Sequence, residues 1–194
     1  MIKGSEKRQA DHPVEGIFVN RWSPRAMSGE EISREEMLTL FEAARWAPSS
    51  MNNQPLRILY ATRSNRYWPL FFDLLVESNK VWCTRAAALL VVISKTTFEN
   101  GKPCRTHTYD SGSAWMSLAL QGSIMGLVVH GMQGFDYERA RIDLGIPEEY
   151  QVEAMAALGR PGRIEDLPGQ LQERETPNDR RPQAQSVCEG PFSL

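Results

Sequence analysis

Cysteine is scarce in this chain, and no stretch of it is long and apolar enough to cross a membrane. Cys83, Cys104 and Cys188 are far apart among the 194 residues and form no C-x-x-C pair, so a disulfide framework is not expected. The longest apolar run, residues 86–93, is much shorter than the ~20 residues of a membrane-spanning helix. The first 16 residues contain no apolar signal-peptide core. These features predict a cytoplasmic protein with no membrane partner.

A large excess of charge of one sign is also missing. The 22 Lys and Arg residues are balanced by 24 Asp and Glu residues, which gives a net charge of -2. A general basic surface would be needed to attract nucleic acid or an anionic membrane, so neither is expected as a partner. Any anion that the protein binds must meet a local cluster of cations.

The common signatures of nucleotide binding and hydrolysis are missing as well. The sequence contains no G-x-G-x-x-G, no G-x-x-x-x-G-K-[ST] and no G-x-S-x-G. The three histidines, His12, His107 and His130, are scattered without metal-ligand spacing, so no metal site is expected. No His, Cys or carboxylate stands out as a catalytic residue.

The remaining pattern predicts one domain over residues 1–194 with mixed helices and strands. Ser33 and Glu36 form a capping box that starts a helix, and Pro48 requires this helix to end by Ala47. After residue 160, five prolines and few apolar residues predict a segment that is either disordered or an extended C-terminal arm lying on another surface, and the arm is the working interpretation. The other expected helices cover residues 67–78, 110–126 and 137–146, and the expected strands lie within residues 56–61, 86–94, 127–136 and 151–159.

The long helix expected over residues 110–126 is rich in small residues. Gly and Ser residues in its interior lower helix propensity, so close packing against a neighbour has to compensate. Asp110 is interpreted as the N-cap of this helix, and Trp115 as a packing residue.

Two polar segments indicate a binding site. In Arg21-Trp22-Ser23-Pro24-Arg25, alternate residues of an extended chain face the same way, so Arg21, Ser23 and Arg25 could converge on one anionic group. Taken alone, two arginines near a helix start are more readily explained as solvated surface charge. In the second segment, residues 48–54, five hydrogen-bonding side chains lie between Pro48 and the following Pro55, more than a simple turn requires.

These segments occur in a recognisable order. R-x-S-x-R is followed by A-P-S-S-x-N-x-Q-P, then by D-x-G-x-A in a helix, and then by G-L ahead of G-F-D. In this order, from about Arg21 to Arg180, the chain resembles the nitroreductase family of FMN-dependent oxidoreductases. The resemblance implies an α+β fold with a central, mostly antiparallel sheet flanked by helices. It also implies an intertwined homodimer that exchanges C-terminal arms and binds two FMN molecules at the subunit interface.

The resemblance assigns cofactor contacts to fifteen residues. Arg21, Trp22 and Ser23 match positions at the FMN phosphate and ribityl chain, Trp22 mainly through its backbone, and Arg25 matches a basic position near the flavin N1 and O2. Asn79 matches a residue at the pyrimidine edge, and Arg180 a second phosphate-binding arginine. The partner's flavin is bordered by a loop that matches Pro48, Ser49, Ser50, Asn52 and Gln54, and one face of the ring lies on a turn that matches Gly131, Met132, Gln133 and Gly134.

Several positions depart from the family pattern. Many relatives have Pro and Glu where this chain has Gly131 and Gln133, and some have Lys in place of Trp82 and Asn178. The charge beside the flavin therefore differs from that of relatives. The resemblance implies that FMN binds, whereas the redox potential and the acceptor cannot be carried over.

The resemblance implies an enzyme in which the flavin, and no side chain, carries the chemistry. NADH or NADPH would be the donor, and a flat, electron-poor molecule such as a quinone or nitroaromatic would be the acceptor. Two alternatives stay open. One is a relative with another flavin reaction, reductive dehalogenation or flavin fragmentation, and the other is a module that binds or senses FMN without turnover.

Overall fold

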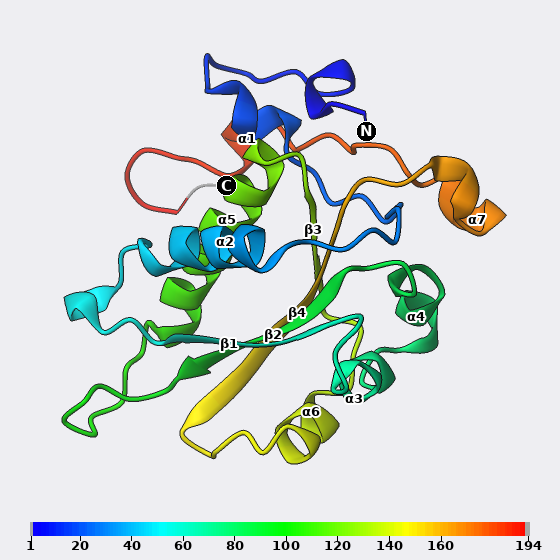
Figure 1. The fold of residues 1–194 in the computed structure, drawn as a ribbon. Helices are drawn as coiled ribbons and strands as arrows, with labels where there is room; N and C mark the ends of the chain where they lie inside the picture. Colours follow the sequence, from blue (N-terminus) through cyan, green and yellow to red (C-terminus); the bar gives the residue numbers. More distant parts are fainter. Residues whose placement is uncertain (1, 193–194) are drawn as a thin grey trace.

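A computed structural model of the protein describes residues 2–192. One four-stranded sheet in the order β1-β2-β4-β3, antiparallel throughout, forms its centre (Figure 1). Helices cover both faces of this sheet, so the predicted α+β fold with a flanked antiparallel sheet is confirmed. The strands are β1 (Leu56–Thr62), β2 (Ala88–Lys95), β3 (Val128–Met132) and β4 (Tyr150–Gly159). The α-helices are α1 (Gly16–Asn20), α2 (Arg34–Arg45), α3 (Trp68–Asp73), α4 (Glu77–Cys83), α5 (His107–Ile124), α6 (Tyr137–Asp143) and α7 (Gly169–Gln172).

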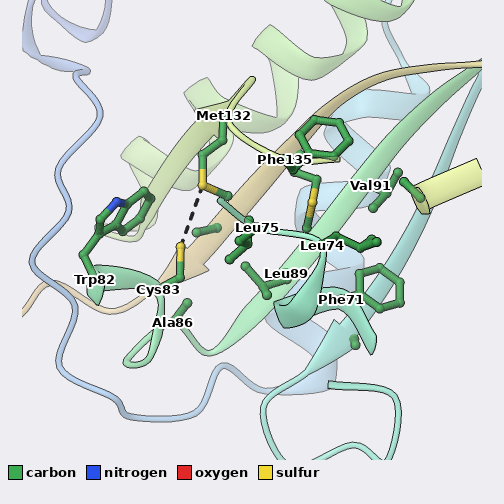
Figure 2. Close-up of a cluster of buried hydrophobic side chains, with 14 of the residues drawn as sticks. Phe71, Leu74, Leu75, Trp82, Cys83, Ala86, Leu89, Val91, Met132 and Phe135 are labelled. Carbon is green, nitrogen blue, oxygen red and sulfur yellow. Dashed lines mark hydrogen bonds between the residues drawn. The ribbon is translucent and has the colours of Figure 1, made fainter. Parts of the chain in front are cut away.

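Two hydrophobic clusters, one on each face, hold the helices to the sheet. The first joins α2 and α5 to the sheet through Leu40, Leu118 and Ala156. The second, drawn in Figure 2, includes Phe71 of α3, Leu74 directly after it, Trp82 and Cys83 of α4, and Val91 of β2. Strand β2 lies between the two clusters and is buried along almost its whole length, as its continuous apolar run predicts.

The start of α2 agrees with its predicted capping box. Glu36 N donates to Ser33 Oγ at 3.1 Å, and Ser33 N donates to Glu36 Oε2 at 2.8 Å. Arg160, directly after β4, donates to both carboxylate oxygens of Glu36 at 2.9 Å. The cap therefore also fixes α2 to the end of β4, and α2 leads out of the segment that contains Arg21, Ser23 and Arg25.

Three predicted helices differ in the structure. The helix expected over residues 137–146 ends at Asp143, with Leu144 as its C-cap residue. The single helix expected over residues 67–78 is divided into α3 and α4, because Leu75 bridges to Phe135 and Val76 N donates to Gly134 O at 3.1 Å. Helix α5 starts three residues earlier than expected, with Thr106 as its N-cap residue. Asp110 is therefore not the N-cap, and its carboxylate is available to the loop before β1.

The C-terminal arm begins by packing on its own chain. Ser28 N donates to Arg160 O at 3.0 Å, and Gly162 N donates to Ala26 O at 2.9 Å, beside a bridge between Met27 and Pro161. The arm then passes α7 and returns to the N-terminal segment, where Gln183 N donates to Asp11 Oδ2, so the first and last described segments lie at the same end of the molecule (Figure 1). In the described residues, no helix is long and apolar enough to cross a membrane.

Candidate functional site

A cavity of about 420 Å³ opens between the segment before α2 and the C-terminal arm. The predicted convergence of Arg21, Ser23 and Arg25 is found here, and Arg180 meets them from the arm. We call this space the arginine cavity. Its lining consists of Arg8, Arg21, Trp22, Ser23, Arg25, His130, Arg174, Thr176, Asn178 and Arg180.

Extended backbone after α1 places these side chains. Arg21 ends α1 with φ -64° and ψ 126°, and its Nη1 donates to Trp22 O at 3.1 Å and to Ser23 Oγ at 3.4 Å. Trp22 also uses its indole, which donates to Ile2 O at 2.8 Å. The indole therefore ties the N-terminal residues to the wall of the cavity, a contact that the sequence pattern does not reveal.

Arg25 is the one arginine of the cavity with a carboxylate partner in the described residues. Glu175, only 3% exposed, accepts hydrogen bonds from Arg25 N at 2.6 Å and Ala26 N at 2.8 Å, and its Oε2 lies 3.8 Å from Arg25 Nη1. A buried carboxylate requires such partners. Glu175 therefore fixes the arm to the Arg25 segment and balances the charge of Arg25.

The positive charge of Arg8, Arg21 and Arg180 is not balanced in the same way. No ion pair in the described residues involves any of the three. Burial lowers the pKa of the Arg21 guanidinium, and the nearby charges of Arg8 and Arg180 lower it further. Arginine remains charged in spite of such shifts. The three like charges thus create a site that an anion would stabilise.

His130 forms part of the cavity wall as a neutral imidazole. Its Nδ1 donates to Pro24 O at 2.8 Å, and its ring centre lies 4.6 Å from that of Trp82. Burial lowers the pKa of His130 to about 4, and the positive charges of Arg25 and Arg21 add to this effect. The side chain is therefore uncharged near pH 7, where it holds the chain at Pro24 and does not add to the positive charge.

Asn79 and the turn after β3 lie next to this wall. Asn79 Nδ2 donates to Gly134 O at 3.0 Å, and Trp82 Nε1 donates to Asn79 Oδ1 at 3.2 Å. A Cβ atom on Gly134 would lie 2.6 Å from Asn79 Nδ2, so only glycine permits this approach. Asn79 and the turn are therefore connected to the arginine cavity through Trp82, which contacts His130 in the cavity wall.

The turn is anchored from both sides of the sheet. The Met132 side chain points into the core, where the Cys83 thiol lies 3.7 Å from its sulfur (Figure 2). Gly131 faces α5 instead, and a Cβ atom there would lie 2.7 Å from the Trp115 ring.

A second cavity, of about 490 Å³, is lined by Gly131, Met132 and Gln133 together with part of α5. Two buried polar atoms beside it, Trp115 Nε1 and Ser111 Oγ, have no hydrogen-bond partner in the described residues.

The polar loop before β1, residues 48–54, has an unusual backbone. Met51, Asn52 and Gln54 have φ values of 51°, 55° and 49°, a region that side chains other than glycine disfavour. Gln54 N donates to Ser49 Oγ at 2.9 Å, and Ser50 N donates to Asp110 Oδ2 at 3.1 Å. The loop is therefore held in a fixed shape by its own side chains and by α5.

This loop does not line the arginine cavity of its own chain. Pro48, Ser49 and Gln54 line a third cavity, of about 390 Å³, with Asp110 and other residues of α2, β1 and α5. Ser50 and Asn52 line neither cavity, and the carbonyl of Asn52 accepts from Gln54 Nε2 at 3.2 Å. The predicted sharing of a site between this loop and a partner's flavin remains a prediction.

Several residues of the arginine cavity were missed by the sequence analysis. Arg174 and Thr176 of the arm are the missed residues, and they alternate in the sequence with Asn178 and with the predicted Arg180. This period of two is the signal typical of an extended segment with one face toward a site. Arg8 comes from a short polar segment with no pattern of its own, so only the structure shows its position.

The described residues contain no group of three or more His, Cys, Asp or Glu side chains that could hold a metal ion. The three cysteines are free thiols, with Cys83 and Cys104 buried.

Known proteins match both the sequence and the fold. A solved structure of an oxidoreductase containing FMN is 42% identical, with a TM-score of 0.94 and coverage of 99% of each chain. A nitroreductase from Desulfovibrio desulfuricans, solved in complex with FMN, is 22% identical, with a TM-score of 0.72 over 95% of this chain and 100% of the other.

A curated relative, an uncharacterized 15.4 kDa protein of Mycolicibacterium smegmatis, is 30% identical over 91 residues. These residues make up 47% of this chain, and the match spans 61% of the length of that relative. The model of the nitroreductase family matches residues 19–160, which include the Arg21 segment, the polar loop and the turn after β3. The chain therefore belongs to the nitroreductase family.

Proposed function

We propose that this protein is an FMN-dependent oxidoreductase that passes electrons from NADH or NADPH to a flat, electron-poor acceptor such as a quinone or nitroaromatic. The observation that carries the proposal is the arginine cavity, where the guanidinium groups of Arg8, Arg21 and Arg180 lie close together and form no ion pair with a carboxylate of the described residues. A phosphate dianion is the group that such a cavity suits best.

The neighbouring residues suit the rest of an FMN molecule. In this arrangement Arg21, Ser23 and Arg180 bind the phosphate, and Arg25, whose charge Glu175 balances, lies toward the ring. Asn79 and the turn from Gly131 to Gly134 border the isoalloxazine, where glycine leaves the backbone open to close approach.

The flavin would accept a hydride from the nicotinamide at N5 and transfer its electrons to the acceptor. The chain's part is to bind, orient and supply a positive field. His130 is neutral near pH 7 and donates to Pro24 O, in the segment that carries Arg21. Its ring also contacts Trp82, which donates to Asn79. His130 would therefore hold the phosphate-binding residues and the residues beside the flavin ring in fixed positions.

We further propose that two chains form the active unit. The loop of residues 48–54 is held rigidly and lies apart from the arginine cavity of its own chain. Large hydrophobic side chains at the end of α2, in the loop and near the start of α5, namely Trp46, Met51 and Tyr109, are at least 73% exposed. A second copy would cover them and bring its loop to the flavin, as in an intertwined homodimer.

A second candidate is a protein that binds FMN without turnover. The observation that favours it is Gln133, exposed and uncharged at the turn where many relatives have Glu. Reductive dehalogenation and flavin fragmentation have less support. Family members with these reactions usually add a lid segment over the flavin, whereas here α3 and the residues after it bury Phe71, Leu74 and Leu75 in the core.

The test is reduction of the flavin-loaded protein. We expect NADH or NADPH to bleach the flavin absorbance near 450 nm within the time of a normal turnover, roughly a second or less. Addition of a quinone or nitroaromatic should then restore the absorbance. Flavin-loaded protein that neither nucleotide reduces would overturn the enzyme and leave the binding module.

A further inference from the structure

The N-terminal segment, residues 2–12, precedes the part of the chain that the family model matches. It runs beside the C-terminal arm at one end of the molecule, drawn blue against orange and red in Figure 1. Ser5 N donates to Asn20 Oδ1 at 3.1 Å, and Gln183 N of the arm donates to Asp11 Oδ2 at 2.8 Å. The N-terminal segment therefore connects Asn20, the residue before Arg21, to the C-terminal arm, which supplies the other wall of the arginine cavity.

Arg8 is the centre of this connection. Its Nη1 donates to Val19 O at 2.9 Å and to Arg21 O at 2.8 Å, and its Nε donates to Asn178 O at 2.7 Å. One guanidinium thus binds three backbone carbonyls from two distant parts of the chain. One of those parts carries Arg21, and the other carries Arg180.

The charge of Arg8 is not matched by a carboxylate within ion-pair distance in the described residues, and its partners are neutral carbonyls. Burial lowers the pKa of Arg8, and the charge of Arg180 lowers it further, although Asp179 acts in the opposite direction. Arg8, Arg21 and Arg180 therefore repel one another while the hydrogen bonds of Arg8 hold the two segments together.

We propose that Arg8 is a positioning residue for the phosphate: it fixes Arg21 and Arg180 at the spacing that a phosphate dianion requires, and the dianion in turn holds the two ends of the chain together. The proposal rests on the proposed binding of FMN. Because three of the five N–H donors of Arg8 already bind carbonyls, its main action is on the two arginines and not directly on the ligand.

Gly4 provides a way to disturb the same connection without removing a charge. A Cβ atom on Gly4 would lie 1.9 Å from Val19 O and 3.0 Å from Arg8 Nη1. Because the first contact is with backbone, Gly4→Ala must displace the segment and, with it, the bond from Arg8 to Val19 O.

The experiment compares FMN with riboflavin, which lacks the phosphate, by flavin-fluorescence titration of the apoprotein. We expect Arg8→Met, Arg8→Lys and Gly4→Ala each to weaken FMN binding about tenfold, since one such hydrogen-bonded contact is worth that much. Riboflavin affinity should change less than about twofold in all three, because the ring end of the site is untouched. Lys7→Met removes an exposed charge next to Arg8 and should leave both affinities unchanged.

Three results would overturn the proposal: Arg8→Lys binding FMN as tightly as the unmodified protein, equal loss for FMN and riboflavin, or no loss at all. The first would mean that only the charge matters, and the second that the fold is generally weakened. A second readout is amide hydrogen exchange of residues 2–12, which FMN should slow in the unmodified protein and not in Arg8→Met. Failure of the unmodified protein to bind either flavin would overturn the proposed function itself, which separates the two failures.

Discussion

The arginine cavity and the polar loop of residues 48–54 are both candidate walls of one site, but they are built in opposite ways. The cavity is formed by side chains on extended backbone, and its cations come from three separate segments of the chain. The loop is formed by its backbone, with Met51, Asn52 and Gln54 at positive φ. Electrostatic repulsion is stored in the first region, and backbone strain in the second.

The two regions also differ in what would stabilise them. An anion removes the repulsion between Arg8, Arg21 and Arg180, so the cavity is completed by a ligand. The loop is already satisfied within the chain, because Asp110 accepts from Ser50 N and Ser49 Oγ accepts from Gln54 N. The cavity should therefore respond strongly to ligand, and the loop should respond to changes in its own support.

The largest expected effect is at Arg21, which has no carboxylate partner in the described residues. Charge-assisted hydrogen bonds are worth roughly 1.5 to 3 kcal/mol, so Arg21→Ala should weaken FMN binding about tenfold to a hundredfold. Fluorescence titration measures this loss. Arg34→Ala, at an exposed arginine that starts α2, is the matched control and should bind normally. An unchanged affinity in Arg21→Ala would reject the phosphate assignment.

A pH titration sharpens the comparison, because His130 lies on the cavity side. Its folded pKa of about 4 is below the ordinary value near 6.5, so the unfolded chain binds a proton first as the pH falls. This contribution to stability is complete above about pH 6.5 and falls by about 2 kcal/mol on going from pH 7 to pH 5. Urea unfolding at several pH values should show a smaller decrease in His130→Asn, whose amide can still donate to Pro24 O. Parallel curves for the two proteins would contradict the assignment.

A loss of similar size is expected where the loop meets α5. Asp110→Ala leaves Ser50 N and Thr106 Oγ1 without their shared acceptor, which should lower the free energy of unfolding by about 2 kcal/mol. Asp110→Asn keeps a carbonyl oxygen and should lose less. The affinity for inorganic phosphate should be unchanged in both, since the arginine cavity lies elsewhere. Weaker phosphate binding in these variants would mean that the two regions are coupled within one chain.

The smallest effect concerns the strain in the loop. At Met51, with φ 51° and a side chain that is 87% exposed, Gly should be more stable than Val by about 1 kcal/mol, because Val resists positive φ. At Asn53, with φ -67°, the same pair should show no such advantage for Gly. Thermal unfolding of the four variants tests this. Equal preference at both positions would show that the loop relaxes freely.

The sequence predicted those parts of the fold and the site that depend on local patterns. Alternation placed Arg21, Ser23 and Arg25 on one cavity, and the capping box at Ser33 placed the start of α2. The break between α3 and α4 was missed, because it depends on a pairing of Leu75 with Phe135, sixty residues away. Arg8 and Glu175 were missed for the same reason, since each acts through contacts between the two ends of the chain.

The most direct test of the account is the visible absorption spectrum of the purified protein, with the supernatant after heat denaturation examined for released flavin. The arginine cavity predicts a yellow protein that releases about one flavin per chain, and that this flavin is FMN and not riboflavin. A colourless protein that also fails to take up added FMN would contradict the account, and the cavity would then have to serve a different anion.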